Sequence, residues 1–180
     1  PVPSTTLFRS LSSTQIGALN ATNFATLDST AIATLSATEI KSVTATQLAG
    51  ITTTALGAFT STEIGQLSTT QLGAINATNI AALDTTQLGG LSTTQIAALS
   101  TTTIGALTST QIGDLSTTQI GGLSATQLKS LSTTDFADFN DTQIAAFSAT
   151  QLAALSAANF SAIDATGIAG LSTTQIKGVT

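Results

Sequence analysis

Five residue types are missing from this 180-residue sequence: Cys, His, Met, Trp and Tyr. Without Cys and His the chain cannot build a zinc site, a thiol nucleophile or a Ser-His-Asp triad. Its only cations are Arg9, Lys41, Lys129 and Lys177, too few to neutralise a run of nucleic-acid phosphates. No apolar run approaches the roughly 18 residues of a membrane helix. We therefore expect no enzymatic activity, no cofactor, no nucleic-acid partner and no membrane insertion.

Charge is scarce as well. Only 7% of the residues are charged, against about 25% in ordinary soluble domains, so hydroxyl and amide groups must keep the surface soluble. A hydrophobic content of 42% with a net charge of −5 argues against intrinsic disorder. Abundant Thr and Ser beside few Lys and Glu favour a secreted protein, and we expect an extracellular or cell-surface location.

One eight-residue unit recurs along the chain without insertion or deletion. An apolar residue returns at every eighth position from Leu11 to Val179, and a second apolar series follows five positions behind, from Ile16 to Ile176. The octad reads Leu-Ser-Thr-Thr-Gln-Ile-(Gly/Ala)-(Ala/Gly), with 21 complete copies over residues 11–178 after a degenerate copy at 3–10. We predict a single repeat domain over 1–180. The missing initiator Met and terminal caps suggest a fragment of a longer array.

The octad carries the signals that start a helix. Its second position is always Ser, Thr, Asn or Asp, the residues that accept a backbone N–H as helix N-cap. Three positions later the fifth is most often Gln, which completes a capping box. The apolar first and sixth positions then have the spacing of a hydrophobic staple. The pattern predicts one helix of about six residues in each octad.

Helices this short are unstable alone, so the octads must stack on one another. We predict an all-α solenoid, a rod of short helices with both apolar series inside. The alternative is a β-solenoid, which the many Thr residues favour. Alternating spacings of five and three, however, would place successive apolar side chains on opposite faces of a strand.

Two further positions refine this expectation. The fourth is Thr in every copy from Thr6 to Thr174 except at Ala158, so we expect a crowded site with a packed methyl group. All four cations occupy the seventh position, which must therefore open to solvent. The small residues that otherwise fill it suggest that another backbone passes close by.

Few residues qualify for a functional site. Asp135, Asp138 and Asp141 lie close in sequence and could bind calcium through oxygen atoms, although their octad positions differ and a solvated acidic patch explains them equally. Glu39 and Glu63 hold the capping-box position, so we interpret them as caps and not as paired hydrolase carboxylates. The seven Phe residues replace Ile or Leu at core positions.

The unit as it stands in residues 91–98, Leu-Ser-Thr-Thr-Gln-Ile-Ala-Ala, resembles the Thr- and Gln-rich repeat tracts of large bacterial secreted or surface proteins. Those proteins are described as adhesin-like or haemagglutinin-like. The resemblance spans the whole chain and implies a stalk, spacer or extracellular filament. It supplies no catalytic or binding residues. Because the solenoid ends would expose apolar stacking surfaces, we also expect self-association into a homopolymer.

A surface-binding module is the alternative function. Thr pairs recur at the octad period, and a regular rank of hydroxyl and methyl groups could match ice or a polysaccharide surface. The pairs are interrupted by Ala at the third position of several copies, for example at Ala21, Ala77 and Ala149. On a helical rod we expect the fourth-position Thr to be packed, which would leave no continuous rank.

Overall fold

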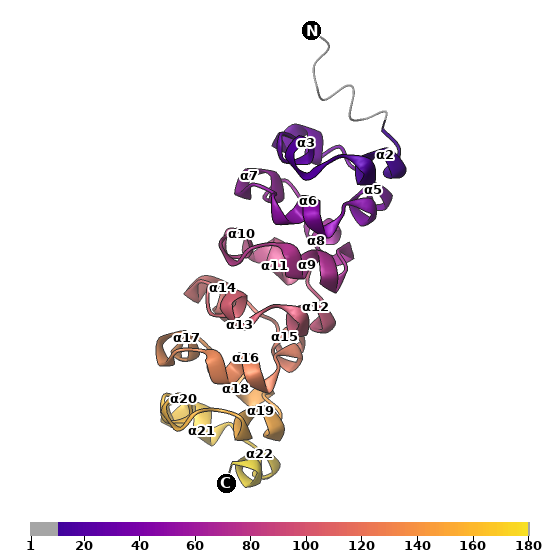
Figure 1. Cartoon of the computed structure of the whole chain (residues 1–180). Coiled ribbons are helices and arrows are strands. Elements are labelled where there is room, and N and C mark those ends of the chain that lie inside the picture. The colour runs from indigo at the N-terminus through magenta and orange to yellow at the C-terminus, as the bar shows by residue number, and fades with distance from the viewer. Residues whose placement is uncertain (1–10, 180) are drawn as a thin grey trace. The chain divides into compact units, whose positions relative to one another are not determined.

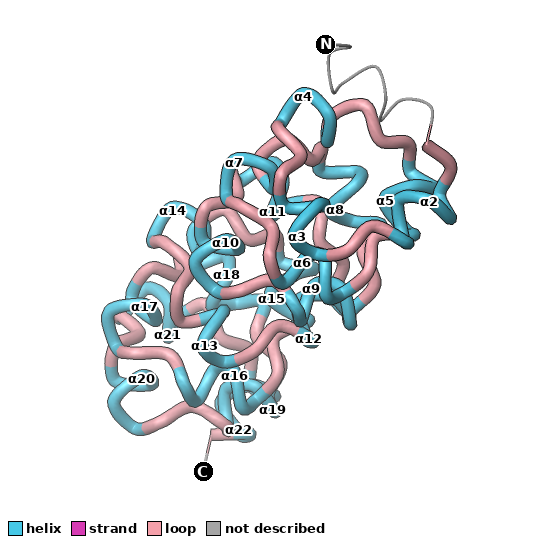
Figure 2. Tube along the Cα trace, turned by 45° about the horizontal axis from the view of Figure 1, so that its top comes forward, coloured by secondary structure: helices cyan, strands magenta, loops and turns pink. Residues whose placement is uncertain are grey.

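The computed structural model describes residues 11–179, so the degenerate copy at 3–10, with Arg9, lies outside the described residues. Over this range the chain is entirely helical, and short helices alternate with loops without any strand (Figure 2). The all-α prediction is therefore confirmed and the β-solenoid is excluded. The described chain divides into two compact units, with the boundary between Leu91 and Ser92.

The first unit contains ten described helices: α2 (Ser13–Ala18), α3 (Ala21–Ala25), α4 (Ser29–Ile32), α5 (Ala37–Ser42), α6 (Ala45–Ala49), α7 (Thr53–Leu56), α8 (Ser61–Gln66), α9 (Thr69–Ala74), α10 (Ala77–Ala81) and α11 (Thr85–Gly89). The second contains eleven: α12 (Thr93–Ala98), α13 (Thr101–Ile104), α14 (Ser109–Gly113), α15 (Thr117–Gly122), α16 (Ala125–Ser130), α17 (Thr133–Ala137), α18 (Asp141–Ala146), α19 (Ala149–Ala153), α20 (Ala157–Ser161), α21 (Ala165–Ala169) and α22 (Thr173–Gly178). Each helix belongs to one octad, as the pattern predicts.

Every described helix begins at the predicted cap. In α12, for example, the hydroxyl of Ser92 accepts the N–H of Gln95, and the Gln95 side chain accepts the N–H of Ser92 at 2.8 Å. The reciprocal box closes in the described helices whose fifth octad residue is Gln, Glu or Asp. The first-position residue then turns to extended backbone, as at Leu99 with ψ 143°, and the next cap follows.

Each helix packs against the third helix along the chain. In the first unit α2 contacts α5, α5 contacts α8 and α8 contacts α11, and these helices follow one another in Figure 1. In the second unit α12 contacts α15, α15 contacts α18 and α18 contacts α21. Within each unit, three consecutive octads therefore make one turn of a solenoid.

The two apolar series form the core of each turn. Ile16, Ile96 and Leu128 are completely buried, and the series is buried through most of the described chain. Five of the Phe residues belong to this core, and Phe136, Phe139 and Phe147 form a cluster with ring centroids 5.4–6.0 Å apart. The series is less covered towards the end of the described range, where Ile176 is 43% exposed.

Small residues at the seventh and eighth positions allow neighbouring turns to approach. A Cβ atom on Gly65 would lie 2.6 Å from the carbonyl oxygen of Gly90, and one on Gly122 would lie 2.7 Å from that of Thr93. Nothing lies within 4 Å of such an atom on Gly121, so the crowding affects only some copies. Lys41, Lys129 and Lys177 are exposed, which confirms that the seventh position opens to solvent.

Candidate functional site

The fifth-position Gln side chain makes bonds in two directions. In α18 the Oε1 atom of Gln143 accepts the N–H of Asn140 at 2.9 Å and closes the capping box. Its Nε2 atom donates to the carbonyl oxygens of Ile112 at 2.8 Å and Leu115 at 2.8 Å, which belong to the preceding turn. The amide is 2% exposed. One side chain therefore caps its own helix and ties it to the preceding turn.

This arrangement repeats within both units. The acceptor carbonyls lie 28 and 31 residues before the donor, where one helix of the preceding turn ends and the next begins. The donors described are Gln47, Gln71, Gln87, Gln127, Gln143, Gln151 and Gln175, with Asn79 and Asn159 donating through shorter amides. We call these bonds the amide ladder.

Sequence reasoning assigned only the cap to this position. The cap needs an acceptor, and Gln and Glu both supply one, whereas a link to the preceding turn needs the N–H of an amide. The preference for Gln over Glu was the available signal. Glu39 and Glu63 cap their helices as expected, with the N–H groups of Ser36 and Thr60 donating to their carboxylates at 2.6 and 2.7 Å. A carboxylate adds no donor to the ladder.

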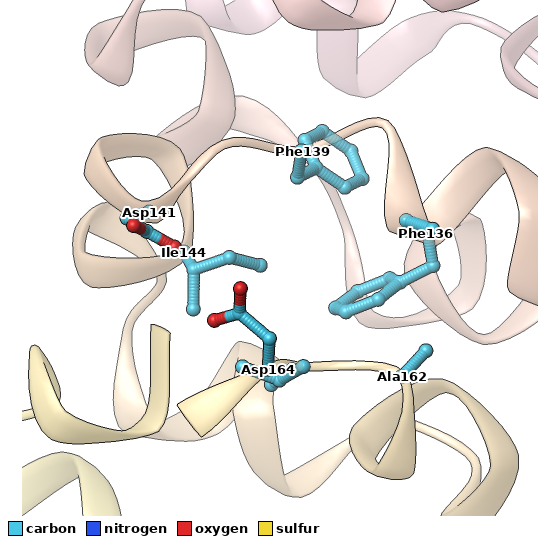
Figure 3. A pocket seen from close by; sticks show the side chains of 8 residues that line it. Phe136, Phe139, Asp141, Ile144, Ala162 and Asp164 are labelled. Carbon is cyan, nitrogen blue, oxygen red and sulfur yellow. The ribbon is translucent and has the colours of Figure 1, made fainter. Parts of the chain in front are cut away.

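The three aspartates of the calcium hypothesis are not brought together. Asp135 accepts from the hydroxyl and N–H of Ser132 at 2.7 and 3.1 Å, Asp138 ends α17, and Asp141 begins α18. Over residues 11–179, no group of three or more His, Cys, Asp or Glu side chains could hold a metal ion. The carboxylate that faces the same space as Asp141 is that of Asp164, which the sequence analysis did not single out (Figure 3).

A cavity of about 200 Å³ lies between the turns of the second unit. Its lining includes Phe136, Phe139, Ile144 and Ala162 together with Asp141 and Asp164 (Figure 3). It is apolar on one side and carries two carboxylates on the other. Its position in the solenoid corresponds to a missing rung of the amide ladder, because the fifth residue of this octad is Gly167.

The fourth-position Thr is exposed, which corrects the expectation of a crowded, packed site. It is exposed in every described copy from Thr14 to Thr174, as is Ala158. The reason is helical geometry, since the fourth and sixth positions point about 200° apart on a helix, and the sixth points into the core. Equivalent Thr residues of stacked helices, such as Thr94, Thr118 and Thr142 in α12, α15 and α18, therefore form a regular column on the surface.

Comparison with known families finds a match to the repeat. Residues 64–101, 80–117 and 94–125 match the model of the ALTTAQ repeat family. The chain is similar to this family over that stretch. The match supports a tandem-repeat tract with a structural role, and the repeat-only fold suggests a non-catalytic protein. A comparison with curated proteins found no match. Within residues 11–179, none of the helices has the length and apolarity needed to span a bilayer.

Proposed function

We propose that the chain is a non-enzymatic structural protein that serves as a stalk, spacer or extracellular filament at a bacterial surface. The amide ladder carries this proposal. A solenoid that adds one turn for every three octads sets distance in proportion to its length. Bonds between successive turns resist their separation, because breaking one leaves a buried amide and a carbonyl unpaired.

Two further features support the same proposal. Cores with little charge and surfaces rich in hydroxyl groups need no metal, cofactor or partner to fold, which suits a passive element outside the cell. Repeats that bury their apolar face only against neighbours can also add further copies end to end, so we include self-association into a homopolymer in the proposal.

Immunogold labelling of the cells that produce the protein tests its location. Antibodies raised against the purified repeat should label intact cells, at a distance from the envelope that grows when the three octads at 67–90 are duplicated. A chain from which 67–90 is deleted serves as the matched control and should shorten that distance. Labelling that requires permeabilised cells, or a distance that does not follow the number of turns, would contradict the stalk.

The exposed Thr columns favour a second candidate, a module that binds ice or a polysaccharide surface. The column of Thr94, Thr118 and Thr142 is the best one in the second unit, because Thr93 and Thr117 stand beside it. Inhibition of ice recrystallisation by the purified chain should disappear when all three are replaced by Lys. The matched control replaces Thr102, Thr126 and Thr150, whose column is flanked by Ala125 and Ala149 and should matter less. Inactivity of the unaltered chain would remove this candidate.

A further inference from the structure

The cavity beside Gly167 lies where other turns hold a Gln side chain. In α18, one turn earlier, Gln143 Nε2 donates to the carbonyls of Ile112, Gly113 and Leu115. Their equivalents three octads further on are Phe136, Ala137 and Phe139, and all three line the cavity. Because Gly167 has no side chain, this turn lacks the amide that would fill the space and donate to these carbonyls.

The walls of the cavity supply hydrogen-bond acceptors and aromatic surface. A Cβ atom on Gly167 would lie 3.5 Å from Oδ1 of Asp141 and 3.5 Å from Oδ1 of Asp164, so both carboxylates border the space that the Gln would occupy. Asp164 Oδ1 accepts the N–H of Gly167 at 2.8 Å and is held in place by it. On the other side Phe136 and Phe139 pack edge to face with their ring centroids 5.5 Å apart.

The chemistry of this lining selects a cation that carries both N–H groups and an apolar part. Two carboxylates attract positive charge, and a positive group is also favourable beside aromatic rings. A bare metal ion would leave the apolar wall uncovered, and the cavity offers only two carboxylates. A volume of about 200 Å³ limits the occupant to a few heavy atoms.

We propose that this cavity binds a small primary alkylammonium ion. The ammonium group takes the place of the missing Gln amide and donates to the carboxylates of Asp141 and Asp164, while the alkyl chain lies against Phe136 and Phe139. The site belongs to one turn of the solenoid, so it gives the chain a local binding activity that a stalk does not require.

Nuclear magnetic resonance of the full chain tests the proposal with butylammonium chloride as the probe. The Gly167 amide and the ring signals of Phe136 and Phe139 should shift with saturation. Butanol, which lacks the charge, and tetramethylammonium, which lacks N–H groups, should shift them less at equal concentration. Equal shifts with sodium or calcium chloride, or shifts spread evenly over the chain, would overturn the proposal.

Three variants sharpen the test. Asp141→Asn should raise the butylammonium concentration at half-saturation about tenfold, because one of the two charges is lost. Asp138→Asn is its matched control, since Asp138 does not line the cavity, and should bind as the unaltered chain does. Gly167→Gln should abolish the shifts and raise the melting temperature by restoring the ladder, although the Ile163 side chain must move to admit the new Cβ atom. Unchanged binding by Asp141→Asn would contradict the proposed site even if Gly167→Gln failed to fold.

Discussion

At the residue scale, the side chain at the fifth octad position has to be both acceptor and donor. Gln71 shows the requirement, because it accepts the N–H of Ser68 at 2.7 Å and donates to the carbonyl of Val43 at 2.6 Å while 7% exposed. Asp or Glu satisfies the first bond only, and Ala or Gly satisfies neither. The stability of each turn should therefore depend on which residue stands at this position.

Replacing Gln71 by Glu should destabilise the chain by about 3 kcal/mol, because it removes the donor and places a charge among carbonyl oxygens in a buried site. The control is Gln15→Glu in α2, the first described helix, where the exposed side chain closes a capping box. It should change stability by no more than about 0.5 kcal/mol. Urea unfolding measures both, and equal effects would show that Gln acts only as a cap.

The reverse substitution should stabilise a natural gap in the ladder. Glu63 in α8 is half-buried and caps Thr60, and Ile32 and Leu35 hold the carbonyls that an amide at this position would reach. Glu63→Gln keeps the cap and adds a donor, so we expect a gain of about 1 kcal/mol in the free energy of unfolding. Calorimetry of the two proteins should show the higher melting temperature in the variant. A lower one would mean that the charge at the helix N-terminus matters more than the added bond.

At the element scale, a helix of four to six residues exists only because its ends are capped and its neighbours cover it. Both signals are local in sequence, a cap at the second position and an apolar residue four positions later. The helices and their boundaries could therefore be predicted from the octad alone. The exposure of the fourth-position Thr could also have been predicted, from its angle to the sixth residue on the helix, but the expectation of crowding rested on its near-invariance.

Removal of one cap should cost about 1 kcal/mol. Ser68→Ala takes away the hydroxyl that accepts the N–H of Gln71 at 3.2 Å, so that N–H loses its partner. Thr70→Ala in the same helix serves as control, because Thr70 is exposed and should contribute little. Urea unfolding should separate the two variants. Equal losses would indicate that the Thr column, and not the cap, stabilises α9.

At the scale of the whole molecule, the number of helices in a turn decides which residues meet. An octad period is compatible with any number of octads per turn, so the sequence pattern predicts stacking but not that each helix meets the third one along. The cavity beside Gly167 could not be predicted for the same reason, since it depends on which carbonyls lie next to the fifth position. Phe136 and Phe139 belong to the turn before Gly167, and only the three-octad period brings them to the same cavity wall.

The three-octad turn is therefore the central claim, and distances between paired spin labels test it most directly. The chain has no native Cys, so labels on Thr94→Cys and Thr118→Cys, both exposed and three octads apart, report the separation of α12 and α15 without interference. Stacked helices lie about 8–10 Å apart, and this pair should be closer than Thr94→Cys with Thr110→Cys, which is only two octads away but on another stack. A distance that simply increases with separation in sequence would contradict the account.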